Sequence, residues 1–469
     1  MSTLVQIEIT PELQQEIRSD LAWHYRIIPK EVTESVTSFY IDEEQDQFLV
    51  QEELVALLGV TVELIPVSKD ILQRSLGKYY RTTNDQENKI TFDAKVDFVD
   101  RLIQEANNIG SSDIHIEIFG ENARVRMRID GMLIQRYLVE KADYPELINK
   151  IKIRSNLDIS EKRLPQDGRI QYEDFDIRVS ILPTLHGEKI VLRILGKDAS
   201  SLSIDKLGFS EMEKTYYLEG IKKPNGIILI SGPTGSGKTT TLYATLKMLN
   251  DEKRNIVTVE DPIEYTLDGI NQVQLKESIG LTFASALRSF LRQDPDVIML
   301  GEIRDAETAQ MAIRAALTGH LVLSTIHTNS AWGTISRLID MGVPSFLLAN
   351  TINSSVAQRL VRKLCECKTE VDLDPNDWPI GSSKVNIPST HAVAVGCDKC
   401  HYTGYKGRIA LYEVIPMDHE LSNAIKNNDS SVEDLLGKRN IKTLANRALE
   451  ILTEGKTSLE EVYALLTGY

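Results

Sequence analysis

Apolar residues in the second half of the chain fall into short uninterrupted runs that are separated by segments with helical spacing. The runs GIILI (226–230), DVIML (296–300) and HLVLSTI (320–326) have the length of buried strands, and LYATLKML (242–249) repeats its apolar residues with a helical period. Strands and helices that alternate in this way form βαβ units with parallel strands. The pattern therefore predicts an α/β fold with a parallel sheet.

The segment 93–197 shows a different pattern. A helical pattern over 96–110 is followed by stretches in which polar and apolar residues alternate, as they do in half-buried strands. These stretches are DIHIEIFG, ARVRMRIDGMLIQ, RIQYEDFDIRVSIL and EKIVLRIL. We expect an α+β domain here.

One of these strands alternates arginines with apolar residues. Val125, Met127 and Ile129 should face one side of the sheet, and Arg124, Arg126 and Arg128 the other. The basic side is either a solvated face or a surface that meets another subunit.

Changes in pattern and composition divide the rest of the chain. We expect a small helical domain at 1–80, a polar linker at 81–92, the α+β domain at 93–197, a hinge at 198–207, an α/β core at 208–360, a cysteine-containing insert at 361–405 and a helical C-terminal part at 406–469. In the last part Gly455 should end a helix, and Ser458 and Glu461 should form a capping box at the start of the next one.

The chain has 469 residues and a formal net charge of −15, which repels nucleic acid on average. The start MSTLVQIEIT lacks a basic segment followed by an apolar one. No window approaches the ~20 apolar residues that cross a bilayer. We therefore expect a cytoplasmic protein that reaches the membrane only through partners.

The four cysteines lie close together in the sequence, at Cys365, Cys367, Cys397 and Cys400. Cytosolic thiols stay reduced, and clustered thiolates suit tetrahedral zinc, so the cluster predicts a zinc site rather than disulfides. The first pair is C-x-C, whereas C-x-x-C forms the usual chelating turn. A site with relaxed geometry or weaker affinity therefore remains an alternative.

The stretch SGPTGSGKTT (231–240) lies between a predicted strand and a predicted helix and matches the phosphate-loop pattern G-x-x-x-x-G-K-[ST]. Backbone amides of such a loop surround the phosphates, the lysine reaches the β- and γ-phosphates, and the hydroxyl ligates Mg²⁺. The predicted nucleotide-binding residues are Gly232, Pro233, Thr234, Gly235, Ser236, Gly237, Lys238, Thr239 and Thr240, with Thr239 on Mg²⁺. No N-K-x-D guanine signature occurs, which favours ATP over GTP.

Carboxylates follow two predicted strands, at the edge of the sheet where ligands bind. NIVTVEDPIEY supplies Glu260, Asp261 and Glu264, and a carboxylate there can orient the attacking water. DVIMLGEIRD supplies Glu302, the predicted second carboxylate of the magnesium shell. HLVLSTIHT brings His327 to the same edge, where it either senses the γ-phosphate or is structural.

Arginines can provide the cations that stabilise a phosphoryl-transfer transition state. ALRSFLRQDPD places Arg288 and Arg292 on one helical face, and Arg304 follows Glu302. The alternative is that these arginines form surface salt bridges.

Taken together, these residues resemble the secretion ATPases that drive type II secretion and type IV pilus assembly. The resemblance extends from SSDIHIE, RLPQDGR and PTLHGEKIVLRIL in the α+β domain to GKTSLEEV near the end of the chain. It implies a RecA-like ATPase core, a PAS-like second N-terminal domain and a short first domain that docks a partner.

The resemblance also implies roles for individual residues. Glu264 corresponds to the glutamate proposed to activate water, Glu302 to the Walker B position and His327 to the His box. Arg178 and Arg193 correspond to arginines that close on the nucleotide. Arg288, Arg292, Arg304 and Arg408 correspond to arginines of the site and of the subunit interface.

By this resemblance the protein is a hexamer that hydrolyses ATP and powers assembly of a secretion pseudopilus or a true pilus. It would act through an inner-membrane platform protein and a further membrane partner. Assembly motors carry the tetracysteine insert and retraction motors lack it, which disfavours retraction. Two rivals are a RecA-type motor acting on DNA, disfavoured by the charge of −15, and a scaffold that binds ATP without turnover, disfavoured by the carboxylates Glu264 and Glu302.

Overall fold

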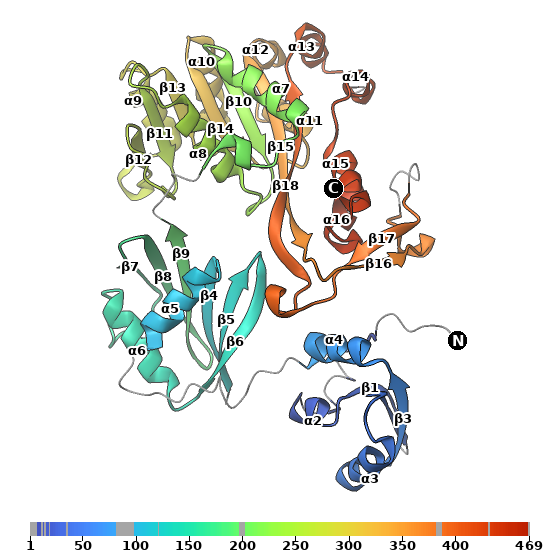
Figure 1. The fold of residues 1–469 in the computed structure, drawn as a ribbon. Coiled ribbons are helices and arrows are strands. Elements are labelled where there is room, and N and C mark those ends of the chain that lie inside the picture. The colour runs from blue at the N-terminus through green and yellow to red at the C-terminus, as the bar shows by residue number, and fades with distance from the viewer. Residues whose placement is uncertain are drawn as a thin grey trace.

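The computed structural model describes most of the chain (Figure 1). The described residues are 7–10, 13, 16–17, 19–33, 36–80, 98–120, 122–196, 202–380, 387–429 and 432–467. The predicted linker at 81–92 lies outside them, as do residues 198–201 of the predicted hinge. Across these described stretches, no helix combines the length and apolarity that a membrane span requires.

The first part of the chain folds around a three-stranded sheet. β1 (Ile27–Val32) is antiparallel to β2 (Val36–Asp42), and β2 is parallel to β3 (Thr61–Val67). The helices are α2 (Ser19–His24), α3 (Gln47–Leu58) and α4 (Lys69–Tyr79). The prediction of a helical domain at 1–80 is therefore wrong. VTSFYID and TVELIPV are rich in β-branched and aromatic residues, which favour strands, but such short runs carry little periodicity.

The next part forms an antiparallel six-stranded sheet in the order β6-β5-β4-β9-β8-β7. Its strands are β4 (Asp113–Phe119), β5 (Asn122–Ile129), β6 (Met132–Glu140), β7 (Gln166–Gln171), β8 (Phe175–Thr184) and β9 (Gly187–Gly196). The helices α5 (Phe98–Asn108) and α6 (Tyr144–Arg154) share one apolar core with this sheet, as Leu102, Leu147 and Val125 illustrate. These elements match the α+β pattern of the sequence.

The arginines of β5 lie on the other side of the sheet, where they meet acidic partners. Arg126 Nε lies 2.8 Å from Glu117 Oε2, and Lys189 Nζ lies 3.0 Å from Glu117 Oε1. Burial raises the pKa of Glu117, but the hydrogen bonds from Arg126 and Lys189 outweigh it and bring the pKa down to about 2. The basic face thus carries its own counter-charge.

The second half of the chain contains a seven-stranded sheet in the order β12-β11-β13-β14-β10-β15-β18. Its strands are β10 (Gly226–Ser231), β11 (Ile256–Glu260), β12 (Asn271–Gln274), β13 (Val297–Leu300), β14 (Leu321–Ile326), β15 (Ile352–Leu364) and β18 (Tyr405–Pro416). All neighbours pair in parallel except β15 and β18, which are antiparallel. The predicted parallel sheet is present, with one antiparallel edge strand added.

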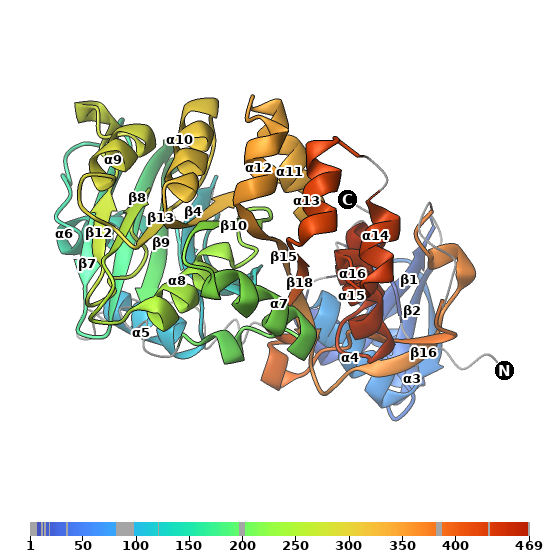
Figure 2. The same ribbon diagram turned by 90° about the horizontal axis from the view of Figure 1, so that it is seen from above.

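Helices cover both faces of this sheet, as Figure 2 shows. Ile227 and Leu229 of β10 enter the core shared with α9 (Phe283–Phe290), α10 (Ala306–Leu317), α11 (Ala331–Asp340) and α12 (Ser345–Thr351). Ile228 and Ile230 enter the core shared with α7 (Glu211–Lys222) and α8 (Lys238–Leu249). Because both faces are buried, the strands read as continuous apolar runs.

In the described part of the chain, four helices follow β18. They are α13 (His419–Lys426), α14 (Glu433–Lys438), α15 (Leu444–Thr453) and α16 (Leu459–Leu466). Their apolar residues pack with Val361 of β15 and with Leu411 and Ile415 of β18. Between β15 and β18 the chain forms a small antiparallel sheet of β16 (Thr369–Asp372) and β17 (Thr390–Val393).

The predicted capping box at Ser458 and Glu461 is not formed. As predicted, α15 ends just before Gly455, which has a left-handed φ of 62°. Ser458 precedes α16, but its hydroxyl lies 2.7 Å from the Tyr405 hydroxyl, and the Glu461 carboxylate pairs with Arg362. Tertiary partners engage both side chains that local pattern assigned to the cap.

Glu413 of β18 is a buried carboxylate that accepts hydrogen bonds from the starts of two helices. Its Oε1 accepts from the Ala331 amide of α11 at 2.8 Å, and its Oε2 from the Leu444 amide of α15 at 3.1 Å. Burial raises the pKa of Glu413, against the opposing effect of these two bonds and of Arg359. One side chain therefore joins β18 to helices that are far apart in sequence.

Glu413→Ala should lower stability, because it leaves two buried amides at helix starts without an acceptor. A loss of about 2 kcal/mol corresponds to a melting temperature lower by roughly 4–8 °C. Thermal unfolding followed by circular dichroism measures it. The control Glu219→Ala, at an exposed position of α7, should melt with the parent. Equal melting of the Glu413 variant would show that the two amides find other partners.

Candidate nucleotide site and cysteine cluster

The phosphate loop connects β10 to α8 at the carboxyl edge of the large sheet. β10 ends at Ser231 and α8 begins at Lys238, so the predicted binding residues form the turn and the first turn of the helix. The amides at this helix start point toward the edge where an anion would bind.

Two glycines of the loop are required by close packing. A Cβ on Gly232 would lie 2.4 Å from the Gln358 carbonyl oxygen, and one on Gly237 would lie 2.8 Å from both Gln358 Nε2 and Leu360 Cδ1. Gly237 also has a left-handed φ of 87°. The loop is thus pressed against β15, and larger residues would push it away.

Lys238 folds back onto its own loop. Its Nζ donates to the carbonyl oxygens of Gly232 at 2.8 Å and Pro233 at 3.0 Å. Partial burial lowers the pKa of Lys238, an effect that the negative charge of Glu302 opposes. An ammonium held mainly by neutral carbonyls is well placed to pair with an incoming phosphate.

A cavity of about 550 Å³ opens at this loop. Its lining includes the predicted residues Thr234, Gly235, Ser236, Gly237, Lys238, Thr239, Thr240, Glu260, Asp261, Glu264, Glu302, Arg304, His327 and Arg408. Gly232 and Pro233 belong to the loop but not to the lining. The fold therefore gathers at one cavity residues that the sequence spreads over about 170 positions.

The two glutamates at the end of β11 and just after it have different surroundings. Glu260 is buried and accepts hydrogen bonds from Thr258 Oγ1 at 2.6 Å, from Gln272 Nε2 at 3.1 Å and from the Tyr243 hydroxyl. Burial raises the pKa of Tyr243, which keeps its hydroxyl protonated as a donor. The same hydroxyl accepts a hydrogen bond from the Glu264 amide at 3.2 Å. Glu260 is thus engaged in structure, whereas the Glu264 side chain remains about one-third exposed at the cavity.

Glu302 is mostly buried just after β13 and faces His327 and Arg304. Its Oε2 lies 3.3 Å from His327 Nε2, and its Oε1 pairs with Arg304. The hydrogen bond that Arg304 donates to Glu302 raises the pKa of Arg304. Three of the predicted residues therefore form one cluster across the ends of β13 and β14.

The remaining predicted arginines lie outside the lining of this cavity. Arg178 of β8 extends from the six-stranded sheet toward the segment after β11. Its Nη2 donates to the Ile263 carbonyl at 2.6 Å, and its Nη1 lies 3.5 Å from Glu264. Arg193 pairs with Asp113 at 2.9 Å within its own sheet. Arg288 pairs with the exposed Glu307, and Arg292 donates to the Arg288 carbonyl.

β15 supplies two neighbouring side chains that sequence reasoning missed. Gln358 Oε1 accepts from the Thr241 hydroxyl at 2.9 Å. The buried Arg359 donates to the carbonyl oxygens of Gln358 at 3.0 Å and of Asn329 at 2.9 Å, in the loop that also carries His327. Burial lowers the pKa of Arg359, and the Glu413 charge opposes this. The stretch QRLVR carries no phosphate signature that could have identified them.

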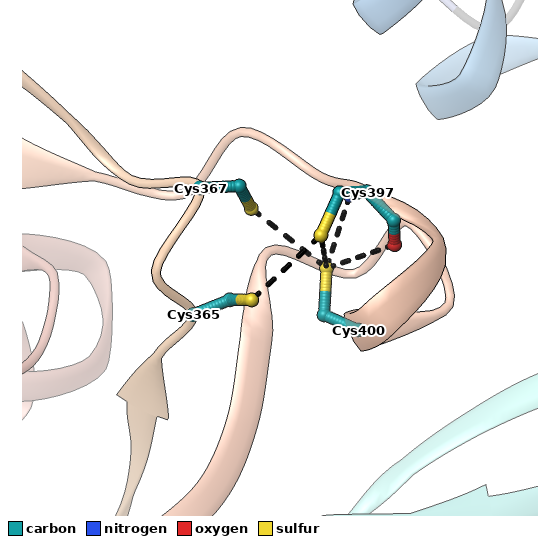
Figure 3. Close-up of side chains that lie close together, drawn as sticks. All are labelled: Cys365, Cys367, Cys397 and Cys400. Carbon is teal, nitrogen blue, oxygen red and sulfur yellow. Dashed lines mark hydrogen bonds between the residues drawn. The ribbon is translucent and has the colours of Figure 1, made fainter.

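The four cysteines converge on one point, as Figure 3 shows. Their Sγ atoms all lie within 4.8 Å of one another. The separations are 3.8 Å for Cys365 and Cys397, 3.9 Å for Cys367 and Cys400, and 3.8 Å for Cys397 and Cys400. A Zn–S bond of about 2.3 Å gives a tetrahedron with edges of about 3.8 Å. The cluster therefore fits one tetrahedral ion.

Backbone amides also point at two of the sulfurs. The Cys397 amide donates to Cys400 Sγ at 3.1 Å, the Gly404 amide to the same atom at 3.3 Å, and the Gly396 amide to Cys367 Sγ at 3.4 Å. Such donors stabilise thiolate ligands and orient them. The C-x-C pair presents both sulfurs to the common centre despite its short spacing.

The chain matches known proteins over most of its length. The family model described as Type II/IV secretion system protein matches residues 89–464. The type II secretion system protein E of Pseudomonas aeruginosa is 46% identical over 370 residues, which cover 78% of this chain and 74% of the relative. The type IV pilus assembly ATPase PilB of Myxococcus xanthus is 39% identical over 484 residues, which cover 93% and 85%.

Two solved structures of known proteins also resemble this chain. The pilus retraction motor PilT with bound ADP is 28% identical, with a TM-score of 0.54 over 78% of this chain and 95% of that one. The ATPase DotB of Legionella pneumophila, at 22% identity, shares the fold with a TM-score of 0.59 over 79% and 96%.

Proposed function

The chain belongs to the family of Type II/IV secretion system proteins, and we propose that it is a hexameric ATPase that powers assembly of a type II secretion pseudopilus or a type IV pilus. It would work at the cytoplasmic side of the inner membrane, bound there through a platform protein and a further membrane partner. The observation that carries the proposal is the cavity that joins the phosphate loop to Glu264 and Glu302. Relatives named for the two machines are equally similar, at 46% and 45% identity, so the proposal covers both.

For the first two domains the proposed division follows separate apolar cores, whereas the cores of the second half of the chain include residues both before 360 and after 406. A partner-docking domain comprises 1–80 and a PAS-like domain 93–197, each with its own core. A RecA-like core at 208–360 holds the parallel sheet, and the tetracysteine insert at 361–405 and the part at 406–469 complete it. The linkers are 81–92 and 198–207.

ATP would lie in the cavity with its phosphates on the amides of residues 232–240. Lys238 would exchange its loop carbonyls for the β- and γ-phosphates, and Thr239 and Glu302 would hold the metal shell. Bound Mg²⁺ would supply charge neutralisation at the phosphates. His327, beside Glu302, would report the γ-phosphate to the α11 loop.

Both Glu260 and Glu264 line the cavity, but Glu264 would orient the attacking water, because the Glu260 carboxylate is buried and already holds hydrogen bonds from Tyr243 and neighbouring side chains. Arg178 already touches Glu264 from the other sheet. Arg178, Arg193, Arg288, Arg292 and Arg304 would supply transition-state cations, some of them across the interface between subunits.

Lys238→Ala should abolish turnover and weaken nucleotide binding, whereas Glu264→Gln should keep binding and lower kcat by about 10²–10⁴-fold. Only the second change acts mainly on the attacking water. Steady-state phosphate release and titration with a fluorescent nucleotide separate the two effects. Glu219→Gln on exposed α7 is the control. If Glu264→Gln lost binding as severely as Lys238→Ala, Glu260 or Glu302 would become the candidate base.

The cysteine cluster should hold one zinc ion per chain. Zinc would stabilise an insert whose own sheet has only two strands. Elemental analysis after mild purification should give a ratio near one, and Cys367→Ser should lower it. A strong chelator should remove an unfolding step from the thermal melt of the parent but not of the variant. A ratio well below one in the parent would refute the site.

Specific ATPase activity should rise with protein concentration, because the outlying arginines complete sites only in the ring. Arg193→Ala should lower kcat and leave the fold intact. Arg154→Ala is the matched control, since it removes another Arg–Asp pair from the same domain. Full specific activity in a dilute monomer, or unchanged kcat in Arg193→Ala, would show that Arg193 is an ordinary surface charge.

A further inference from the structure

The hairpin between β5 and β6 presents a carboxylate at its tip. Asp130 and Gly131 form the turn, with φ of 48° and 89°. Left-handed φ at both residues is typical of the tight type I′ turn. Ile129 pairs with Met132 across the turn, so Asp130 is held on a rigid pair of strands.

This tip rests on the second half of the chain. We call the contacted surface the hairpin seat and define it as Arg362, Leu364, Tyr405 and Gly407. Met132 contacts the Arg362 guanidinium and packs with Leu364 and Tyr405. Asp130 Oδ2 accepts a hydrogen bond from the Gly407 amide at 2.7 Å. A cavity of about 80 Å³ at the contact is lined by Met132 and also by Cys400, so the seat adjoins the cysteine cluster.

Arg408, the residue after the seat, lies between Asp130 and the cavity at the phosphate loop. Its Nε is 3.9 Å from Asp130 Oδ1, and its side chain also lines the cavity at the phosphate loop. The side chain is 50% exposed, so it has room to turn from one place to the other. A triphosphate carries more negative charge than one carboxylate and attracts the guanidinium more strongly.

We propose that Asp130 holds Arg408 away from the nucleotide, and that ATP draws Arg408 off Asp130 and so loosens the hairpin from its seat. This inference rests on the nucleotide site proposed above and adds a contact within one chain that responds to it. Asp130 is a positioning residue, because it acts through Arg408. Linkage is reciprocal, so loss of the Asp130 charge should tighten triphosphate binding by the factor by which triphosphate weakens docking.

The test compares the dissociation constants of a non-hydrolysable ATP analogue for full-length variants. Asp130→Asn removes the charge and keeps the turn, since Asn tolerates left-handed φ. It should bind about fivefold more tightly than the parent, at the low end of typical coupling. The double variant Asp130→Asn, Arg408→Gln should bind the analogue with the same dissociation constant as Arg408→Gln alone. Asp174→Asn, in the exposed turn between β7 and β8, is the matched control and should bind as the parent does.

Hydrogen exchange at the Gly407 amide reports the docked state, because Asp130 is its acceptor. The analogue should speed this exchange in the parent, and exchange in Asp130→Asn should be fast without it. Neither measurement needs turnover, so a parent that binds the analogue without hydrolysing ATP would refute the motor and still test the hairpin. The inference would be overturned if Asp130→Asn bound the analogue with the parent's dissociation constant. It would also be overturned if the analogue left the rate of hydrogen exchange at the Gly407 amide unchanged.

Discussion

The parallel pairing of β10 with β14 on one side and β15 on the other determines the arrangement of the site. Parallel strands end at the same edge, so the phosphate loop, the His327 loop and Gln358 meet there. The contact is close enough that Gly232 has no room for a side chain beside β15. Any shift of β15 would therefore reach the phosphate loop directly, without an intervening layer of flexible side chains.

Charge in the site is arranged around this contact. The cations Lys238 and Arg359 are held largely by backbone carbonyls, whereas the carboxylate Glu302 lies beside Arg304 and His327. Lys238 therefore keeps its charge available at the phosphate loop, and Glu264 brings a carboxylate to the same cavity. Arg178 and Arg408 are cations that bridge the six-stranded sheet and the elements around the cavity, through the Ile263 carbonyl and Asp130 respectively.

Sequence reasoning succeeded where a few adjacent residues carry the signal. The phosphate loop needs glycines at fixed positions, the buried strands read as apolar runs, and the cysteines cluster by themselves. It failed where distant residues compete for a side chain. Ser458 and Glu461 bind tertiary partners instead of capping a helix. Tyr243 donates to Glu260 of β11, and Arg359 donates to Asn329 in the loop that carries His327, and neither partner can be read from the local sequence. The strands of the first domain were missed because their runs are too short to show a period.

The tetracysteine module occupies the loop of an antiparallel hairpin. Leu364 and Tyr405 are paired at the end of the β15–β18 ladder, so the sheet already holds the two ends of the module together. The entropy of closing such a loop changes only slowly with its length. Changes in the length or sequence of the module would therefore leave the pairing of β15 with β18 around Gln358 unchanged. Evolution can thus vary the module while the large sheet stays the same.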